Sequence, residues 1–442
     1  MKRGLILLVM TAVAVAAISG AGFLFRAPKD QGSRSLSSPE LSRLGEAPPT
    51  SQAIDVFAER VRLDPSDAVS FMLLGQLHAQ RARETGDIAS YERAELALRR
   101  ALHLIPAYAP AAAALAEVYY AEHRFTDALE RAERVIEASP GSTQALATMG
   151  DAYLALGRYR QAGRAYRALE TSAGLTPPAL AREAHLAWLH GRTEQALRLM
   201  DRAAVDSLQA GAIGERAAWY QVRLGDLNFG VGRLDTAYAH YEAALGLFDA
   251  SYPALAGQGR VRAAQGRFEE AIELYERAVA IVPQPDLVAA LGDLYALTGH
   301  QELAEQRYET VEAIGELAAL GRQVYNRQLA MFYADHDRNL TKGLELAMAE
   351  IEIRKDVFGY DALAWSLYKN DRYREAARAI EAALRLGTRD AALLYHAGMI
   401  YDALGQKDRA MKLLQEALGL NPNFSPLQAG VARSTLARLA AA

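Results

Sequence analysis

Histidine and the acidic residues are the side chains of this sequence whose spacing could bind a metal or support acid–base chemistry. Nine histidines occur, and none lies in a His-x-x-x-His or His-Glu-x-x-His pattern, which would place two ligands on one face of a helix. The one local cluster is Asp335-His336-Asp337. Consecutive helical side chains point in different directions, so these three would share an ion only where the chain bends. Solvated turn residues are the simpler interpretation, and the cluster remains a weak metal-site candidate.

Other catalytic patterns are missing from the sequence. It contains no cysteine, which excludes disulfides, thiolate metal sites and a cysteine nucleophile. It contains neither a Gly-x-x-x-x-Gly-Lys-Ser/Thr phosphate loop nor a Gly-x-Ser-x-Gly elbow. Pairs such as Glu130 and Arg134 are typical of helix surfaces rather than of acid–base dyads. The sequence therefore predicts a protein with no catalytic residues and no cofactor, which is not an enzyme.

Composition restricts the kind of partner. Hydrophobic residues make up 51% of the chain and charged residues 23%, which is usual for a folded protein. The 49 basic and 53 acidic residues give a net charge of −4. Nucleic-acid binding needs a basic stripe or patch, so nucleic acid is not an expected partner.

The N-terminus carries a targeting signal. Lys2 and Arg3 precede the uncharged segment 4–25, and a membrane-spanning helix needs about 20 apolar residues, whereas a cleavable signal core has about 7–15. The length favours an uncleaved anchor, but the small residues Ser19-Gly20-Ala21 also permit cleavage. Because the basic residues stay in the cytoplasm, either alternative places the rest of the chain outside it, in a periplasmic or other extracytoplasmic space. We expect residues 1–25 to be a signal peptide or membrane anchor, and residues 26–50 to be a Ser/Pro-rich linker.

A period of 33 or 34 residues runs through the remaining chain. Two amphipathic helical stretches recur in each period, joined by a short turn that usually contains glycine. One small residue marks the second stretch, and seven of its nine successive spacings are 33 or 34 residues. These residues are Ala94, Ala128, Ala162, Ala196, Ala237, Ala271, Ala304, Gly343, Ala376 and Ala410.

The residue types of the period have a physical explanation. A glycine or alanine in the first stretch, such as Gly150 or Gly225, lets the paired helix approach closely. The aromatic residue four positions after the marker alanine, such as Tyr166 or Tyr241, lies on the same helix face and can fill the remaining gap. Proline at the end of several periods, as at Pro140, ends the second helix.

This pattern resembles the tetratricopeptide repeat (TPR) family over residues 67–424, as about ten repeats. The resemblance implies an all-α solenoid of helical hairpins wound into a right-handed superhelix. Residues 51–66 are expected to cap its N-terminal end, and residues 425–442 its C-terminal end. Repeats 4 and 8 depart from the pattern, and the piece Arg83-Glu84-Thr85-Gly86-Asp87 is similar to an insert of some exported bacterial members.

The family resemblance also implies which side chains line the concave groove. Aromatic and acidic residues dominate these positions, which include all three tryptophans. They are Tyr120, Asp151, His185, Trp188, Trp219, Asp226, Phe229, Arg260, Asp293, Phe358, Asp361, Trp365, Tyr368, Tyr395 and Asp402. Aromatic residues carry much of the energy of interfaces, and carboxylates attract basic partners. The alternative for each aromatic residue is a packing role within the stack.

These observations predict a scaffold or adaptor that binds an extended, basic or neutral segment of another protein outside the cytoplasm. The run from Arg354 to Trp365 is the densest aromatic and acidic stretch and is expected to form part of the partner site. An uncleaved N-terminal segment would add the membrane as a second partner. Two alternatives remain. One is a protein that binds a metal ion or small ligand at the irregular repeats 7 and 8. The other is a regulatory subunit of a separate enzyme.

Overall fold

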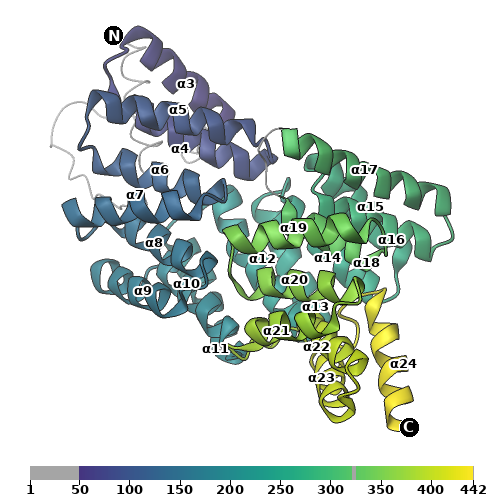
Figure 1. Ribbon diagram of the computed structural model, residues 1–442. Helices are drawn as coiled ribbons and strands as arrows, with labels where there is room; N and C mark the ends of the chain where they lie inside the picture. The colour runs from purple at the N-terminus through teal and green to yellow at the C-terminus, as the bar shows by residue number, and fades with distance from the viewer. Residues whose placement is uncertain (1–48, 321–324, 442) are drawn as a thin grey trace. The chain divides into compact units, whose positions relative to one another are not determined.

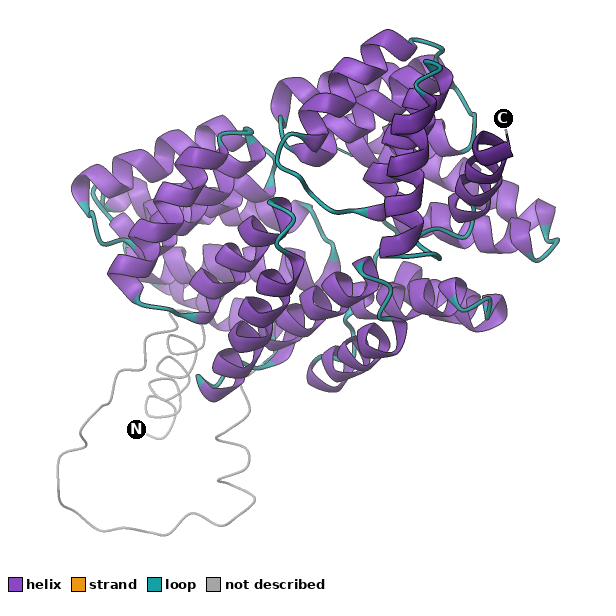
Figure 2. Cartoon of the chain, turned by 90° about the horizontal axis from the view of Figure 1, so that it is seen from below, coloured by secondary structure: helices purple, strands orange, loops and turns teal. Residues whose placement is uncertain are grey.

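The described part of the chain is entirely α-helical. A computed structural model describes residues 49–320 and 325–441, so the expected targeting segment and almost all of the linker lie outside the described residues. The described residues form 22 helices and no strand (Figure 2). Within these residues, no helix has the length and apolar character needed to cross a bilayer.

The helices fall into two compact units, which are described separately. The first unit ends at Val118 and the second begins at Tyr119, within helix α6. The helices of the first unit are α3 (Thr50–Leu63), α4 (Ala68–Thr85), α5 (Ala89–Leu104) and the first part of α6 (Ala109–Ala121). Helix α3 packs on α4, and α4 pairs with α5. The predicted N-terminal capping segment thus contains a helix that covers the first hairpin.

The second unit contains the remaining helices in chain order. They are α7 (Phe125–Ala138), α8 (Thr143–Ala155), α9 (Tyr159–Ala173), α10 (Pro177–Leu189), α11 (Thr193–Gln209), α12 (Gly214–Gly230), α13 (Leu234–Leu247), α14 (Tyr252–Ala264), α15 (Phe268–Ile281), α16 (Pro285–Leu297), α17 (Gln301–Leu320), α18 (Asn326–Asp335), α19 (Leu340–Ile353), α20 (Val357–Lys369), α21 (Tyr373–Leu384), α22 (Ala391–Ala403), α23 (Lys407–Leu420) and α24 (Gln428–Ala441). Each even-numbered helix from α8 to α22 packs most closely on the helix that follows it. Figure 1 labels these helices along the chain. The irregular repeats 4 and 8 form the hairpins α10/α11 and α18/α19, so both exist as helix pairs.

Close approach at small residues holds each hairpin together. The side chains of Ala162, Ala237 and Ala271 are fully buried, as the spacing predicts. A Cβ atom placed on Gly150 would overlap the ring of Tyr166, and one placed on Gly225 would overlap the ring of Tyr241. The Tyr241 ring also fills the space beside Gly257 of the next hairpin, so one tyrosine joins two successive repeats.

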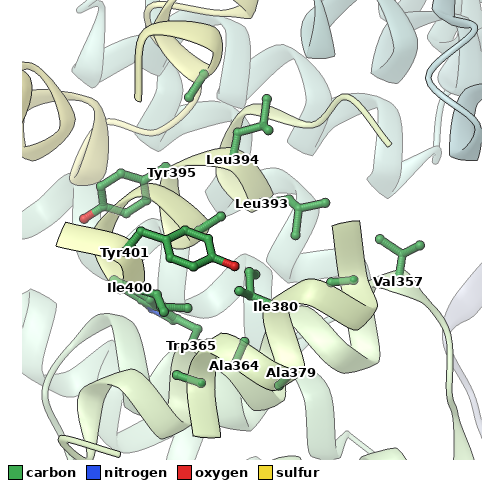
Figure 3. Packing of buried hydrophobic residues seen from close by; sticks show 14 of the residues in the cluster. Val357, Ala364, Trp365, Ala379, Ile380, Leu393, Leu394, Tyr395, Ile400 and Tyr401 are labelled. Atoms are coloured by element: carbon green, nitrogen blue, oxygen red, sulfur yellow. The ribbon is translucent and has the colours of Figure 1, made fainter. Parts of the chain in front are cut away.

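The largest buried cluster lies at the C-terminal end of the second unit. Trp365 of α20, Ile380 of α21 and Tyr401 of α22 converge there (Figure 3), and all three are almost fully buried. Leu154 and Leu189 belong to the same cluster although they come from α8 and α10. The core therefore connects repeats that are far apart in the sequence.

Three polar contacts mark this long-range closure. The Lys355 backbone N–H donates to the Ala155 carbonyl at 2.9 Å. The Thr388 hydroxyl donates to the Leu189 carbonyl at 2.6 Å across 199 residues, and the Asn421 side-chain amide donates to the Phe229 carbonyl at 2.8 Å across 192 residues. Lys355 and Thr388 lie in connections between successive hairpins, and Asn421 lies in the connection after α23. Each contacts the last residues of the first helix of an earlier hairpin, next to the turn inside that hairpin. The turns of three successive hairpins thus contact the connections of three later ones.

We predict that glycine at one of these turns is required for the closure. Gly157 has φ +70°, and a Cβ atom there would strike the Lys355 carbonyl, whereas Gly266 has φ +75° with open space around it. Gly266→Ala should cost about 1–2 kcal/mol, the penalty of a left-handed alanine. Gly157→Ala should cost about 2–4 kcal/mol, because overpacking adds to that penalty.

Urea unfolding followed by circular dichroism measures both variants. Equal losses at the two glycines would contradict the contact between the α8/α9 turn and the α19/α20 connection.

Candidate functional site

The acidic residues predicted to line the groove have partners within the chain. Arg182 donates three hydrogen bonds to the Asp151 carboxylate at 2.7–3.1 Å, and Tyr166 donates a fourth at 2.8 Å. Asp226 accepts from Tyr241 at 2.9 Å and from Arg260 at 2.7 Å. Each carboxylate therefore connects its own hairpin to the next one.

Similar pairs continue toward the C-terminus, where histidine is the partner of two carboxylates and arginine the partner of a third. Asp293 lies 2.6 Å from His336 Nε2, and Asp361 lies 2.9 Å from His396 Nδ1. Asp402 accepts a hydrogen bond from Arg438 of α24. Five of the predicted groove carboxylates are thus paired inside the stack, so the charge that was expected to attract a basic partner is largely neutralised by the chain itself.

Several of the predicted groove aromatics are packed inside the protein. Trp365 and Tyr395 are each 3% exposed. The Trp365 ring stacks on Tyr368 at 4.8 Å and on His396 at 4.3 Å between centroids, and its indole N–H donates to Asp335 at 2.7 Å. The structure therefore assigns Trp365 to the core, which is the packing alternative.

Two further aromatics differ from each other in exposure. Phe229 is 6% exposed and lies under the Arg260 guanidinium at 4.3 Å. Trp219 is 43% exposed and meets Tyr220 edge-on at 5.1 Å. Trp219 is the most exposed of the three tryptophans, but it does not belong to the cavity described next.

Four of the predicted groove residues line one cavity; three of them are aromatic and the fourth is His185. Tyr120 comes from the end of α6, Trp188 from α10 and Phe358 from α20. The cavity has a volume of about 400 Å³, which is within the range of ligand-sized pockets in proteins. The Trp188 and Phe358 rings stack on each other in its wall, with centroids 5.5 Å apart and planes 16° apart. The long-range closure therefore creates a site that no single repeat could form.

The walls of the cavity combine aromatic and basic groups. The remaining lining residues are Ala121, His123, Phe125, Leu154, Ala155, His185, Arg223, Arg327, Arg354 and Asp356. Arg354 lies over the Phe125 ring at 5.0 Å, a distance at which a guanidinium interacts favourably with an aromatic face. Burial lowers the pKa of His185 to about 3, helped by the charge of Arg223, so the imidazole is neutral at physiological pH.

Three of the aromatic residues of this cavity are among those predicted from the sequence, whereas its arginines are not. Arg354 lies in the connection between α19 and α20, and Arg327 lies in α18 of the irregular repeat 8. Arg354 occupies no groove position of the repeat pattern, whereas Arg327 lies 34 residues before Asp361, at the equivalent groove position of repeat 8, and is not among the residues predicted. The paired acids were easier to detect, because Asp151 and Arg182 are 31 residues apart and Asp226 and Arg260 are 34 apart, close to one period.

The weak metal-site candidate has other bonding partners. Asp335 accepts from Trp365 and from Gln428, each at 2.7 Å. His336 contacts Asp293, and Asp337 lies 2.6 Å from the Lys369 ammonium. Within residues 49–320 and 325–441, no group of three or more acidic or histidine side chains is gathered in a way that could hold an ion.

Comparison with known proteins gives matches in three segments. Family models described as "Tetratricopeptide repeat" match residues 119–179, 215–284 and 362–423. No curated protein sequence matches the chain.

Several solved structures are similar. The crystal structure of yeast Tom70 is 13% identical over 89% of this chain and 92% of its own, with a TM-score of 0.35. A tetratricopeptide repeat protein from Parabacteroides merdae is 18% identical over 60% of this chain and 98% of its own, with a TM-score of 0.34. The APC/C hetero-tetramer Cut9-Hcn1 gives 15% identity over 91% and 96%, with a TM-score of 0.33.

We predict that His336 stabilises the fold as an imidazolium. Its Nδ1 lies 2.7 Å from the Phe332 carbonyl, and its Nε2 lies 2.6 Å from Asp293, which also accepts from Tyr308. Both nitrogens face acceptors, so both carry protons. Burial opposes this charge, but the hydrogen bond and charge of Asp293, with a smaller contribution from Asp335, raise the pKa of His336 above its ordinary value.

The sign of the pH effect follows from the raised pKa. The stabilisation is complete below about pH 6.5, the ordinary pKa of histidine, and is lost as the pH rises through the folded value. His336→Gln should cost about 1.5–3 kcal/mol at pH 6 and less at pH 9.

Thermal unfolding at both pH values tests this, with the exposed His300→Gln as the control. A His336→Gln deficit that stays constant or grows with pH would show that the imidazole is neutral.

Proposed function

The chain is a tetratricopeptide-repeat protein, and from this premise we propose that it is a non-catalytic scaffold that holds another protein by an extended segment. The observation that carries the proposal is the cavity at which Tyr120, Trp188 and Phe358 meet. It contains aromatic anchors in a partly enclosed space, the arrangement that concentrates binding energy at protein interfaces. The proposed partner segment runs along the concave side of a right-handed superhelix and inserts a side chain into this cavity.

The proposed location is outside the cytoplasm. Lys2, Arg3 and the uncharged segment 4–25 support export, with that segment as an anchor or a cleaved signal. The helix-stacking repeats support a binding rather than a catalytic role, since each hairpin serves to support its neighbours and present a continuous surface. Protease treatment of intact cells and of lysed cells distinguishes an exported chain from a cytoplasmic one.

We predict that the aromatic pair of the cavity is needed for partner capture. The full-length protein should retain a specific protein from detergent-solubilised membranes. Trp188→Ala with Phe358→Ala should reduce the retained amount by roughly tenfold or more, since hot-spot truncations cost about 2 kcal/mol or more. Quantitative mass spectrometry of the retained proteins is the measurement.

Met348→Ala serves as the matched control, because Met348 is 50% exposed on α19 and does not line the cavity. Circular dichroism establishes that each variant is folded. Equal retention of the partner by the cavity double variant and by the control would exclude the cavity as the binding site. A retained enzyme whose activity changes on binding would assign the regulatory role instead.

A further inference from the structure

The charges of the cavity restrict the chemistry of the segment that it accepts. Three guanidinium groups, those of Arg223, Arg327 and Arg354, line the cavity together with a single carboxylate, that of Asp356. The side chain of Arg354 is only 12% exposed, so its charge lies among apolar walls, where electrostatic attraction is stronger than in water. This charge pattern is opposite to the acidic groove that the sequence predicts.

The hydrogen-bonding capacity of the arginines is only partly used. Among the described residues, Arg327 has one salt-bridge partner, the Asp356 carboxylate at 3.8 Å, which is beyond hydrogen-bond distance. The more distant carboxyl groups of Glu350 and Asp286 also interact with its charge. Arg354 lies 3.5 Å from the Glu350 carboxylate and otherwise contacts the Phe125 ring. A guanidinium carries five N–H donors, so both groups can accommodate a further acceptor.

The acidic neighbours neutralise these arginines only in part. One oxygen of Asp356 caps helix α20 by accepting from the Gly359 backbone N–H at 2.7 Å. Glu350 is 2% exposed, and burial, only partly offset by Arg354 and Arg327, raises the pKa of its carboxyl group. Arg223 is the exception, because it donates to Asp226 at 3.0 Å. Arg327 and Arg354 are therefore the groups that offer charge to a ligand.

We propose that the cavity binds an acidic segment of a partner protein, with a carboxylate between Arg327 and Arg354 and an adjoining apolar side chain against Trp188, Phe358 and Tyr120. The inference rests on the scaffold function proposed above and names the partner class for the same site. The aromatic walls favour a peptide over a free inorganic anion, which has no apolar surface to bury. Charge complementarity of this kind selects partners and excludes basic ones.

The direct test uses a short blocked peptide that carries a glutamate and an aspartate on either side of a phenylalanine, labelled with a rhodamine dye. Its glutamine/asparagine counterpart and its lysine counterpart are the matched controls. Fluorescence anisotropy with the full-length protein should give an affinity for the acidic peptide roughly tenfold higher than for the amide peptide, the value of one charge-assisted contact. Raising the salt from about 0.1 M to about 1 M should weaken binding.

Two variants with opposite expected effects on peptide affinity distinguish a loss of recognition from damage to the fold. Arg327→Gln should weaken binding of the acidic peptide by roughly tenfold. Asp356→Asn should tighten it, since asparagine keeps the helix cap while the carboxylate that competes for Arg327 is lost. Arg378→Gln, at an exposed arginine of α21 whose side chain is 71% exposed, should leave the affinity unchanged.

The opposite results overturn the inference. Tighter binding of the lysine or amide peptide, or no change on Arg327→Gln, would exclude an acidic partner. Displacement of the acidic peptide by inorganic phosphate at the same concentration as by unlabelled peptide would identify a plain anion site. If a captured protein still depends on Trp188 and Phe358 while the acidic peptide does not bind, the scaffold function stands and only the acidic partner class falls. If the acidic peptide binds but no protein is captured, the scaffold function falls.

Discussion

The close approach of two helices at a small residue is the constraint on which the rest of the structure depends. In α8 and α12 a glycine receives the ring of a tyrosine from the following helix, and in this way sets the distance between the two helices of a hairpin. Because this contact between a small residue and a neighbouring helix recurs with a nearly constant period, each hairpin packs on the preceding hairpin in a similar way. Later connections of the chain therefore contact the helix ends beside earlier turns, at Ala155, Leu189 and Phe229. The cavity at Trp188 and Phe358 is a product of those contacts.

Electrostatics inside the stack has a structural role. Carboxylates such as Asp151 and Asp226 accept one hydrogen bond from a tyrosine hydroxyl of their own hairpin and one or more from an arginine of the next hairpin. A buried or half-buried carboxylate with several donors is stabilising only when its donors are held in place, so each pair makes one hairpin depend on its neighbour. In the histidine versions, at His336 and His396, this dependence becomes sensitive to pH. The acidic residues that suggest a binding groove in the sequence thus contribute to cohesion of the stack.

The sequence predicts contacts within a repeat or between neighbouring repeats, but not contacts between hairpins that are far apart in the chain. The buried alanines at positions such as Ala162 and Ala237 and the tyrosines beside Gly150 and Gly225 follow from a period that is visible in the sequence. The pairs of Asp151 with Arg182 and of Asp226 with Arg260 lie about one period apart, and a search for opposite charges at that spacing would have found them. No such signal exists for Arg354 or Thr388, because they lie in connections whose sequence follows no repeat and contact Phe125 and Leu189, which are 229 and 199 residues away. The burial of Trp365 likewise depends on His396 and Asp335, which come from other hairpins.

Chemical cross-linking tests most directly whether distant hairpins of the chain contact one another. The chain contains no cysteine, so cysteines introduced at the exposed positions Arg158 and Lys355 would be the only thiols present. A short bismaleimide should join them rapidly within one molecule, since the Lys355 backbone N–H donates to the Ala155 carbonyl. A control pair at Arg267 and Lys355 provides the background rate. Cross-linking of the Arg158 and Lys355 pair well above this background is the predicted result, and a rate equal to the background would contradict the closure and the cavity that it forms.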